Sequence, residues 1–102
     1  MITPLLGRER LDSTSLEQLI EHLISGGVNG IFILGSTGEA PGLSYQLRRE
    51  VVRQSCSLIR DRVPVFVGIS DTASHEAFRM AEFAAETGAA ALVYSTPFYY
   101  RL

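Results

Sequence analysis

The chain has 102 residues, of which 46% are hydrophobic, and a formal net charge of -2. This length and apolar content fit one small domain with a hydrophobic core, and no apolar run is long enough to cross a membrane. The charged residues are scattered without a basic stripe, which argues against nucleic acid or an anionic membrane surface as a partner.

Two residue counts restrict the compartment and the chemistry. Cys56 is the only cysteine, so an internal disulfide is excluded, which is typical of a reducing compartment. Residues 1–6 lack the charged head and long apolar core of a signal peptide, and we expect a cytoplasmic protein. All nine basic residues are arginine, so a covalent mechanism that needs lysine cannot be completed by these residues alone.

The first expected elements are the end of a strand and an amphipathic helix. Residues 2–4 resemble the last part of a strand whose beginning is missing. Residues 12–15 offer capping groups, and Thr14 and Glu17 have the spacing of a capping box. The helix that follows ends at Gly26-Gly27 and has one apolar face, made of Leu16, Leu19, Ile20, Leu23 and Ile24.

Three apolar strands and two further helices alternate in the rest of the chain. Residues 31–34, 65–69 and 91–94 are apolar without alternation, the pattern of parallel strands covered on both faces. Ser44 is the expected cap of a helix that runs to about Arg60, and Thr72 or Ser74 is the expected cap of a helix closed by Gly88. Such βαβ units have right-handed crossovers, which make all the strands parallel.

An open doubly wound sheet and part of a (β/α)8 barrel both produce this order of elements. The chain starts inside one strand and stops soon after another without a closing helix, so the last strand would expose an edge. It also holds about half the residues of a typical barrel. We therefore expect an α/β fold in which residues 1–102 form a partial TIM barrel, roughly its N-terminal half, with the first strand truncated and the later strands absent.

Hydroxyl side chains follow two of the expected strands, in Gly35-Ser36-Thr37-Gly38-Glu39 and in Thr96-Pro97-Phe98-Tyr99-Tyr100. Because parallel strands end at one edge of a sheet, both clusters are expected at a shared site. Glycines let backbone N–H groups approach a carboxylate or phosphate, and Ser36 and Thr37 add donors. An ordinary tight turn uses the same residue types, and the pattern alone leaves both interpretations open.

The remaining polar groups have structural explanations as well as functional ones. Tyr99 and Tyr100 can relay protons, but tyrosines at such positions are also common packing residues. Helix capping is the simplest role for Ser70-Asp71-Thr72. Glu39 is a candidate general base or a residue that holds backbone amides. His22 and His75 lack the spacing of metal ligands, and we expect no metal and no other cofactor.

These motifs resemble those of the N-acetylneuraminate lyase and dihydrodipicolinate synthase family, the pyruvate-dependent aldolase-type barrels. The resemblance covers nearly the whole chain and rests on Thr3-Pro4, on Gly26-Gly27-Val28-Asn29-Gly30, and on the two hydroxyl clusters. It implies a lyase or synthase in which a lysine forms a Schiff base with pyruvate or a related 2-keto acid. That lysine would belong to a later strand, so we expect the chain alone to be inactive.

The resemblance also implies roles for three residues of this sequence. Ser36 and Thr37, with their backbone amides, would hold the carboxylate of the 2-keto acid. Ser36 would join a proton relay that Tyr99 completes in the site of a partner subunit. The expected assembly is therefore a homo-oligomer, either a dimer or a dimer of dimers.

Several alternatives stay open at the level of the sequence. Ser36 and Phe98-Tyr99-Tyr100 favour the lyase branch, because the synthase branch commonly has Thr in place of Ser36, but neither feature decides between them. A non-catalytic half barrel that serves assembly through its exposed strand edges is a second hypothesis. A phosphate-binding fold is a third, against which the missing P-loop lysine and the missing GxGxxG argue.

Overall fold

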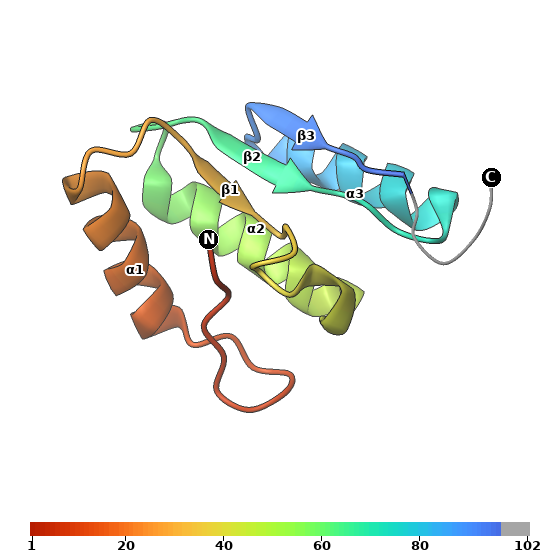
Figure 1. The fold of residues 1–102 in the computed structure, drawn as a ribbon, viewed down its shortest axis with the longest axis horizontal. Coiled ribbons are helices and arrows are strands. Elements are labelled where there is room, and N and C mark those ends of the chain that lie inside the picture. Colours follow the sequence, from red (N-terminus) through yellow and green to blue (C-terminus); the bar gives the residue numbers. More distant parts are fainter. Residues whose placement is uncertain (97–102) are drawn as a thin grey trace.

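The computed structural model describes residues 1–96, in which helices and strands alternate (Figure 1). The helices are α1 (Ser13–Ser25), α2 (Tyr45–Ile59) and α3 (Ser74–Thr87), and the strands are β1 (Ile31–Ile33), β2 (Val65–Gly68) and β3 (Ala91–Val93). A short 3-10 helix, η1 (Ala40–Gly42), follows β1. The predicted succession of β/α units is confirmed over these ranges. None of the helices within residues 1–96 is long and apolar enough to cross a membrane.

The helix boundaries follow from side chains that satisfy free backbone groups. Asp12 caps α1 by accepting hydrogen bonds from the Ser15 N–H at 3.1 Å and from the Ser15 hydroxyl at 2.7 Å. The capping box expected from Thr14 and Glu17 is therefore not what begins this helix. Ser44 caps α2 as predicted, because its hydroxyl accepts from the Leu47 N–H at 3.1 Å.

Helix α3 begins differently from the prediction. Its N-cap residue is Ala73, which makes no side-chain capping bond, so the expectation of a Thr72 or Ser74 cap was wrong. Asp71 acts just before the helix instead, since its Oδ1 accepts from the Ala73 N–H at 2.8 Å. The other end agrees with the prediction: Gly88, with a φ of 113°, ends the helix.

The three strands form one parallel sheet in the order β1-β2-β3. Phe32 is in register with Phe66, which in turn pairs with Ala91. Figure 1 shows α2 and α3 side by side along one side of these strands. Neighbouring strands that follow one another in the chain, with their helices on one side, are the arrangement of a barrel wall rather than of a doubly wound sheet, which has helices on both faces.

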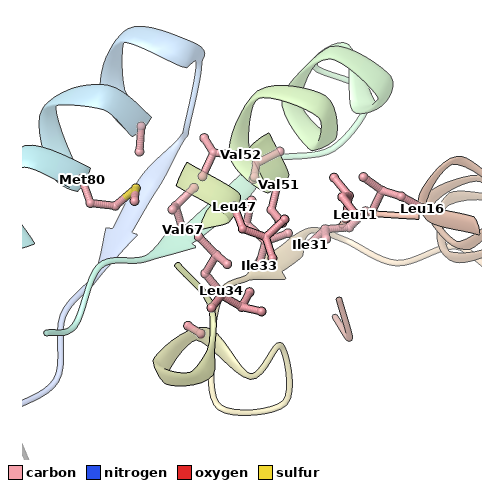
Figure 2. Packing of buried hydrophobic residues seen from close by; sticks show 14 of the residues in the cluster. Leu11, Leu16, Ile31, Ile33, Leu34, Leu47, Val51, Val52, Val67 and Met80 are labelled. Atoms are coloured by element: carbon pink, nitrogen blue, oxygen red, sulfur yellow. The ribbon is translucent and has the colours of Figure 1, made fainter. Parts of the chain in front are cut away.

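Only one face of the sheet is buried within the described part of the chain. Ile31, Ile33, Val65 and Val67 point toward the helices and are at most 5% exposed. Figure 2 shows how Ile31, Ile33 and Val67 meet residues of α2, with Met80 of α3 beside Val67. The opposite face carries Phe32, which is 41% exposed. The prediction that both faces are covered was therefore wrong for residues 1–96, because strands of this length alternate their side chains between a helix-facing side and the side that lines a barrel interior.

The expected strand end at residues 2–4 forms no strand in the structure. The chain instead makes a loop in which Leu5 and Leu11 form an isolated antiparallel bridge. The N-terminal segment is nevertheless fixed beside β1, because the amino group of Met1 donates to the Phe32 carbonyl oxygen at 2.7 Å. The Thr3 hydroxyl, which is buried, donates to the Gly38 carbonyl oxygen at 2.7 Å.

Candidate active site

A hollow of about 170 Å³ lies where the three strands end. Its polar groups are the hydroxyls of Ser36, Ser70 and Ser95, which follow β1, β2 and β3 respectively. The other lining residues are Phe32, Leu34, Gly35, Ala40, Pro41, Gly68 and Val93. The carboxyl edge of the sheet therefore combines an apolar floor with one hydroxyl from each strand end, which is the composition of a small-molecule site.

The turn that leaves β1 depends on close backbone packing against β2. Leu34 has a φ of 59°, a left-handed conformation that costs a bulky residue free energy, and its side chain is only 4% exposed. Its carbonyl group lies so close to Gly68 that a Cβ atom at Gly68 would collide with the Leu34 oxygen. The absence of a side chain at Gly68 thus allows the loop after β1 to cross the end of β2.

The conformation of the loop of residues 35–39 is fixed by a hydrogen bond within the loop and by contacts with the N-terminal segment. The Glu39 N–H donates to the Ser36 carbonyl oxygen at 3.0 Å, which closes the turn. The Thr3 hydroxyl binds the Gly38 carbonyl from the N-terminal side, and a Cβ at Gly38 would lie 3.1 Å from the Met1 carbonyl oxygen. Thr3 was noted in the sequence only as part of a strand end, and its role in fixing this loop was missed.

The loop leaves several hydrogen-bond donors free. Among residues 1–96, no acceptor binds the backbone N–H groups of Ser36 and Thr37, nor their hydroxyls. Ser36 lines the hollow, whereas Thr37 is exposed and is not one of the residues that line it. Unpaired N–H and hydroxyl donors in a turn suit an anionic ligand such as a carboxylate.

Two other sequence candidates contribute less to the described site. The side chain of Glu39 is exposed and forms no hydrogen bond within residues 1–96, although its backbone is left-handed with a φ of 60°. Tyr99, the predicted relay residue, lies outside the described residues together with Phe98 and Tyr100. The structure therefore brings Ser36 to the hollow and leaves the role of Tyr99 a prediction.

Ser70 and Ser95 are the site residues whose roles the sequence did not indicate. Ser70 was interpreted as part of a helix cap, but its Oγ accepts a hydrogen bond from the Ser95 N–H at 2.8 Å. The two Oγ atoms are 3.1 Å apart, so one hydroxyl also donates to the other. The signal that could have found them is the position of a serine two or three residues after the end of an apolar strand, which both share with Ser36.

A second polar cluster fixes the loop after β2 outside the hollow. Oδ2 of Asp71 accepts from the Tyr45 hydroxyl at 2.9 Å and from Arg48 Nη1 at 3.4 Å. The guanidinium of Arg48 also stacks 5.0 Å from the centre of the Tyr45 ring. The hydrogen bond to Asp71, together with burial, raises the pKa of the Tyr45 phenol. This cluster joins the first turn of α2 to the loop that carries Ser70.

The remaining candidate groups carry no reactive arrangement in the described part of the chain. Burial is the main factor that raises the pKa of the Cys56 thiol, as expected for a packing residue rather than a nucleophile. Residues 1–96 contain no cluster of three or more His, Cys, Asp or Glu side chains that could hold a metal ion.

Comparison with known proteins identifies the family. All of residues 1–102 match the model of the dihydrodipicolinate synthetase family. The chain belongs to this family. The resemblance drawn from the hydroxyl clusters is thereby confirmed, and so is the fold of parallel β/α units.

Solved structures of this family superpose closely on the chain. Dihydrodipicolinate synthase from Bacteroides thetaiotaomicron is 46% identical, with a TM-score of 0.96 over 99% of this chain and 34% of that protein. YagE from E. coli K12, solved in complex with pyruvate, is 32% identical, with a TM-score of 0.96 over 99% and 34%. N-acetylneuraminate lyase from Mycoplasma synoviae is 29% identical, with a TM-score of 0.92 over 100% and 36%.

The chain spans about a third of the length of the curated relatives that it matches. This share is smaller than the half barrel expected from the sequence. A dihydrodipicolinate synthase and an N-acetylneuraminate lyase are thus both similar to nearly all residues of this chain.

Proposed function

We propose that this chain contributes the carboxylate-binding part of an aldolase-type lyase or synthase that forms a Schiff base with pyruvate or a related 2-keto acid. The observation that carries the proposal is the set of unpaired donors on Ser36, which lines the strand-end hollow, and on the adjacent Thr37. Membership of the dihydrodipicolinate synthetase family supports it. So does the pyruvate complex of the YagE protein, which is 32% identical to this chain.

The proposed chemistry divides the work between these residues and a lysine amine that the chain does not contain. Two hydroxyls and two backbone N–H groups, all from Ser36 and Thr37, bind the carboxylate and so orient the adjacent keto carbon toward that amine. When the amine adds to this carbon, the keto oxygen must be protonated before it leaves as water. A hydroxyl such as that of Ser36 can pass such protons without bulk water.

The proposal extends to the assembly and to the location of the protein. Tyr99 would complete the relay from a neighbouring subunit of a homo-oligomer, a dimer or a dimer of dimers. The cytoplasm is the proposed location, on the ground that the sequence contains a single cysteine. The shared requirement of both family branches is a 2-keto acid, and the proposal is made at that level.

The proposed carboxylate site at Ser36 and Thr37 is tested by titrating the isotope-labelled chain with pyruvate and following the backbone amide resonances of the chain. We expect the resonances of residues 35–38 to shift. Thr37→Val removes one donor at nearly constant volume and should weaken pyruvate binding about tenfold, the lower end of the range for a hydrogen bond to a charged group. The matched control is Thr87→Val, because within residues 1–96 the Thr87 hydroxyl bonds only the Phe83 carbonyl on α3. Equal affinities for both variants would remove Thr37 from the site.

The Schiff-base step is tested by borohydride reduction in the presence of pyruvate. The chain alone should be labelled only at its N-terminal amine, because it has no lysine. A longer chain that continues past Leu102 should be labelled at a lysine. Labelling of any side chain within residues 1–102 would refute the proposal that the amine of the Schiff base comes from outside these residues.

A non-catalytic assembly module is the second candidate, and the open face of the sheet favours it. Phe32 on this face and Leu92 at the edge strand are about 40% exposed, which leaves apolar surface available for another chain. Sizing combined with the pyruvate titration separates the two functions: a module of this kind elutes as a dimer or larger and does not bind pyruvate, whereas pyruvate binding supports the catalytic proposal in any oligomeric state.

A further inference from the structure

Arg48 of α2 binds both of the segments that lead away from β1 and β2. Its Nε donates a hydrogen bond to the Leu43 carbonyl oxygen at 3.1 Å, and its Nη1 donates to Asp71 Oδ2 at 3.4 Å. Leu43 lies at the end of the segment between β1 and α2 that carries Ser36, and Asp71 follows Ser70 in the loop after β2. One guanidinium group thus connects two segments that meet at the strand-end hollow.

The guanidinium group is itself held in place between these segments. The side chains of Arg48 and Asp71 are only 13% and 9% exposed, and Arg48 stacks 5.0 Å from the centre of the Tyr45 ring. The Tyr45 hydroxyl and the Ala73 N–H also donate to the Asp71 carboxylate. Nε and Nη1 belong to one planar group and keep a constant spacing, which the single nitrogen of a lysine cannot reproduce.

Short backbone hydrogen bonds connect Leu43 to the loop that carries Ser36. The Leu43 N–H donates to the Ala40 carbonyl oxygen at 3.0 Å, and the Ala40 N–H donates to the Gly35 carbonyl oxygen at 3.4 Å. Gly35 and Ala40 line the hollow together with Ser36. A displacement of Leu43 would therefore move the wall of the hollow on the side of Ser36.

The bridge made by Arg48 adds a second contact to the one already described between these segments. The first is the close approach of Leu34 to Gly68, at the ends of the strands themselves. Two segments that touch at one point can rotate about that point, whereas contacts at two separate points fix the angle between them. The width of the hollow therefore depends on both contacts.

We propose that Arg48 is a positioning residue that, by bridging Leu43 and Asp71, holds the loop of residues 35–39 in the orientation that binds a carboxylate, an inference that rests on the carboxylate site proposed for this loop. Arg48 does not itself line the hollow. Burying two charges costs about as much as their attraction returns, so the ion pair adds little net stability and acts mainly on geometry.

The double variant R48M/D71N tests the bridge without leaving a charge unpaired, and the asparagine side chain keeps an oxygen for the Ala73 N–H. Its Tm should change by less than about 5 °C. Pyruvate binding, followed by the amide resonances of residues 35–38, should weaken about tenfold, as for the loss of one hydrogen bond to a charged group. Without ligand, the resonances of residues 35–43 should broaden, because the segment then exchanges between orientations on the microsecond-to-millisecond timescale.

Arg48→Lys separates the bridge from the charge. The lysine ammonium can reach Asp71 or the Leu43 carbonyl but does not span both, so this variant should keep the Tm of the unaltered chain and still lose most of the affinity for pyruvate. If the double variant does not fold, Arg48→Lys decides the question by the same measurement.

Arg62 provides the matched control, because it makes the same kinds of contact before β2, at the opposite end of the sheet. Its Nε donates to the Ile59 carbonyl oxygen at 3.0 Å, and its Nη atoms bind the Glu21 carboxylate. The double variant E21Q/R62M should therefore bind pyruvate as tightly as the unaltered chain.

The possible outcomes separate this inference from the proposed function. Equal pyruvate affinities of the two double variants, or an unchanged affinity in Arg48→Lys, would refute the role of Arg48 and leave the carboxylate site standing. If pyruvate does not shift the resonances of residues 35–38 in the unaltered chain, the carboxylate site fails and the inference fails with it.

Discussion

Replacing Gly68 by alanine tests how the strand ends are packed to form the site. A Cβ atom at Gly68 would overlap the Leu34 carbonyl oxygen and lie 2.9 Å from the Leu34 carbonyl carbon. Both neighbours are backbone atoms, so no rotamer change can relieve the contact, and β1 must move away from β2. Such overpacking costs about 1–3 kcal/mol, and we expect Gly68→Ala to lie at the upper end of this range.

The measurement is urea unfolding followed by circular dichroism, with Gly42→Ala as the matched control. A Cβ at Gly42 meets no atom of the described residues within 4 Å, and the backbone of Gly42 is not left-handed, so this variant should stay within about 1 kcal/mol of the unaltered chain. For a domain of this size a loss of about 2–3 kcal/mol lowers Tm by roughly 10–20 °C. If Gly68→Ala is as stable as Gly42→Ala, the close approach of Leu34 to Gly68 is wrong.

Three further predictions follow from single contacts. Ser55 is fully buried and its hydroxyl has no hydrogen-bond partner within residues 1–96. Ser55→Ala should therefore raise the free energy of unfolding, measured by urea titration, by about 1 kcal/mol. A lower free energy of unfolding would mean that the hydroxyl does have a partner. Thr3→Val deprives the Gly38 carbonyl of its donor and should cost about 1–2 kcal/mol and also weaken pyruvate binding, whereas unchanged binding would show that the loop holds without Thr3. The hydrogen bonds from Ser15 lower the pKa of Asp12 below its ordinary value of 3.8, so the stability that the charged Asp12 provides is present above pH 3.8 and is lost as the pH falls through the lowered pKa. Asp12→Asn still caps the helix but does not titrate, so it should flatten this part of the pH profile of Tm. An unchanged profile would contradict the role given to Asp12.

The elements were predictable because their signals are local. The cap at Ser44, the stop at Gly88 and the apolar face of α1 each depend on residues within one or two helical turns. The strands were predictable as apolar runs, and their common edge followed from the parallel topology. The position of Ser36 at that edge, where it lines the hollow, was therefore predictable as well.

The failures of prediction depend on contacts between segments distant in the sequence. Asp71 binds Tyr45 and Arg48, which precede it by 26 and 23 residues, and no local pattern connects them. Ser70 was assigned to a cap because the next helix is its nearest neighbour in the chain, whereas its partner Ser95 is 25 residues away. Continuous apolar strands hid the exposed face of the sheet, because an apolar run is the same whether its second face meets helices or lines a barrel.

The left-handed backbone of Leu34 has a consequence for efforts to engineer this protein. A leucine tolerates this conformation only because its side chain is anchored in the core, so every substitution that loosens the core around it also relaxes the turn that presents Ser36. Selection for thermal tolerance at this position would favour glycine, which adopts such a backbone freely. The same change would release the anchor, and a variant that gained heat resistance in this way would lose the fixed position of Ser36 on which the proposed carboxylate binding depends.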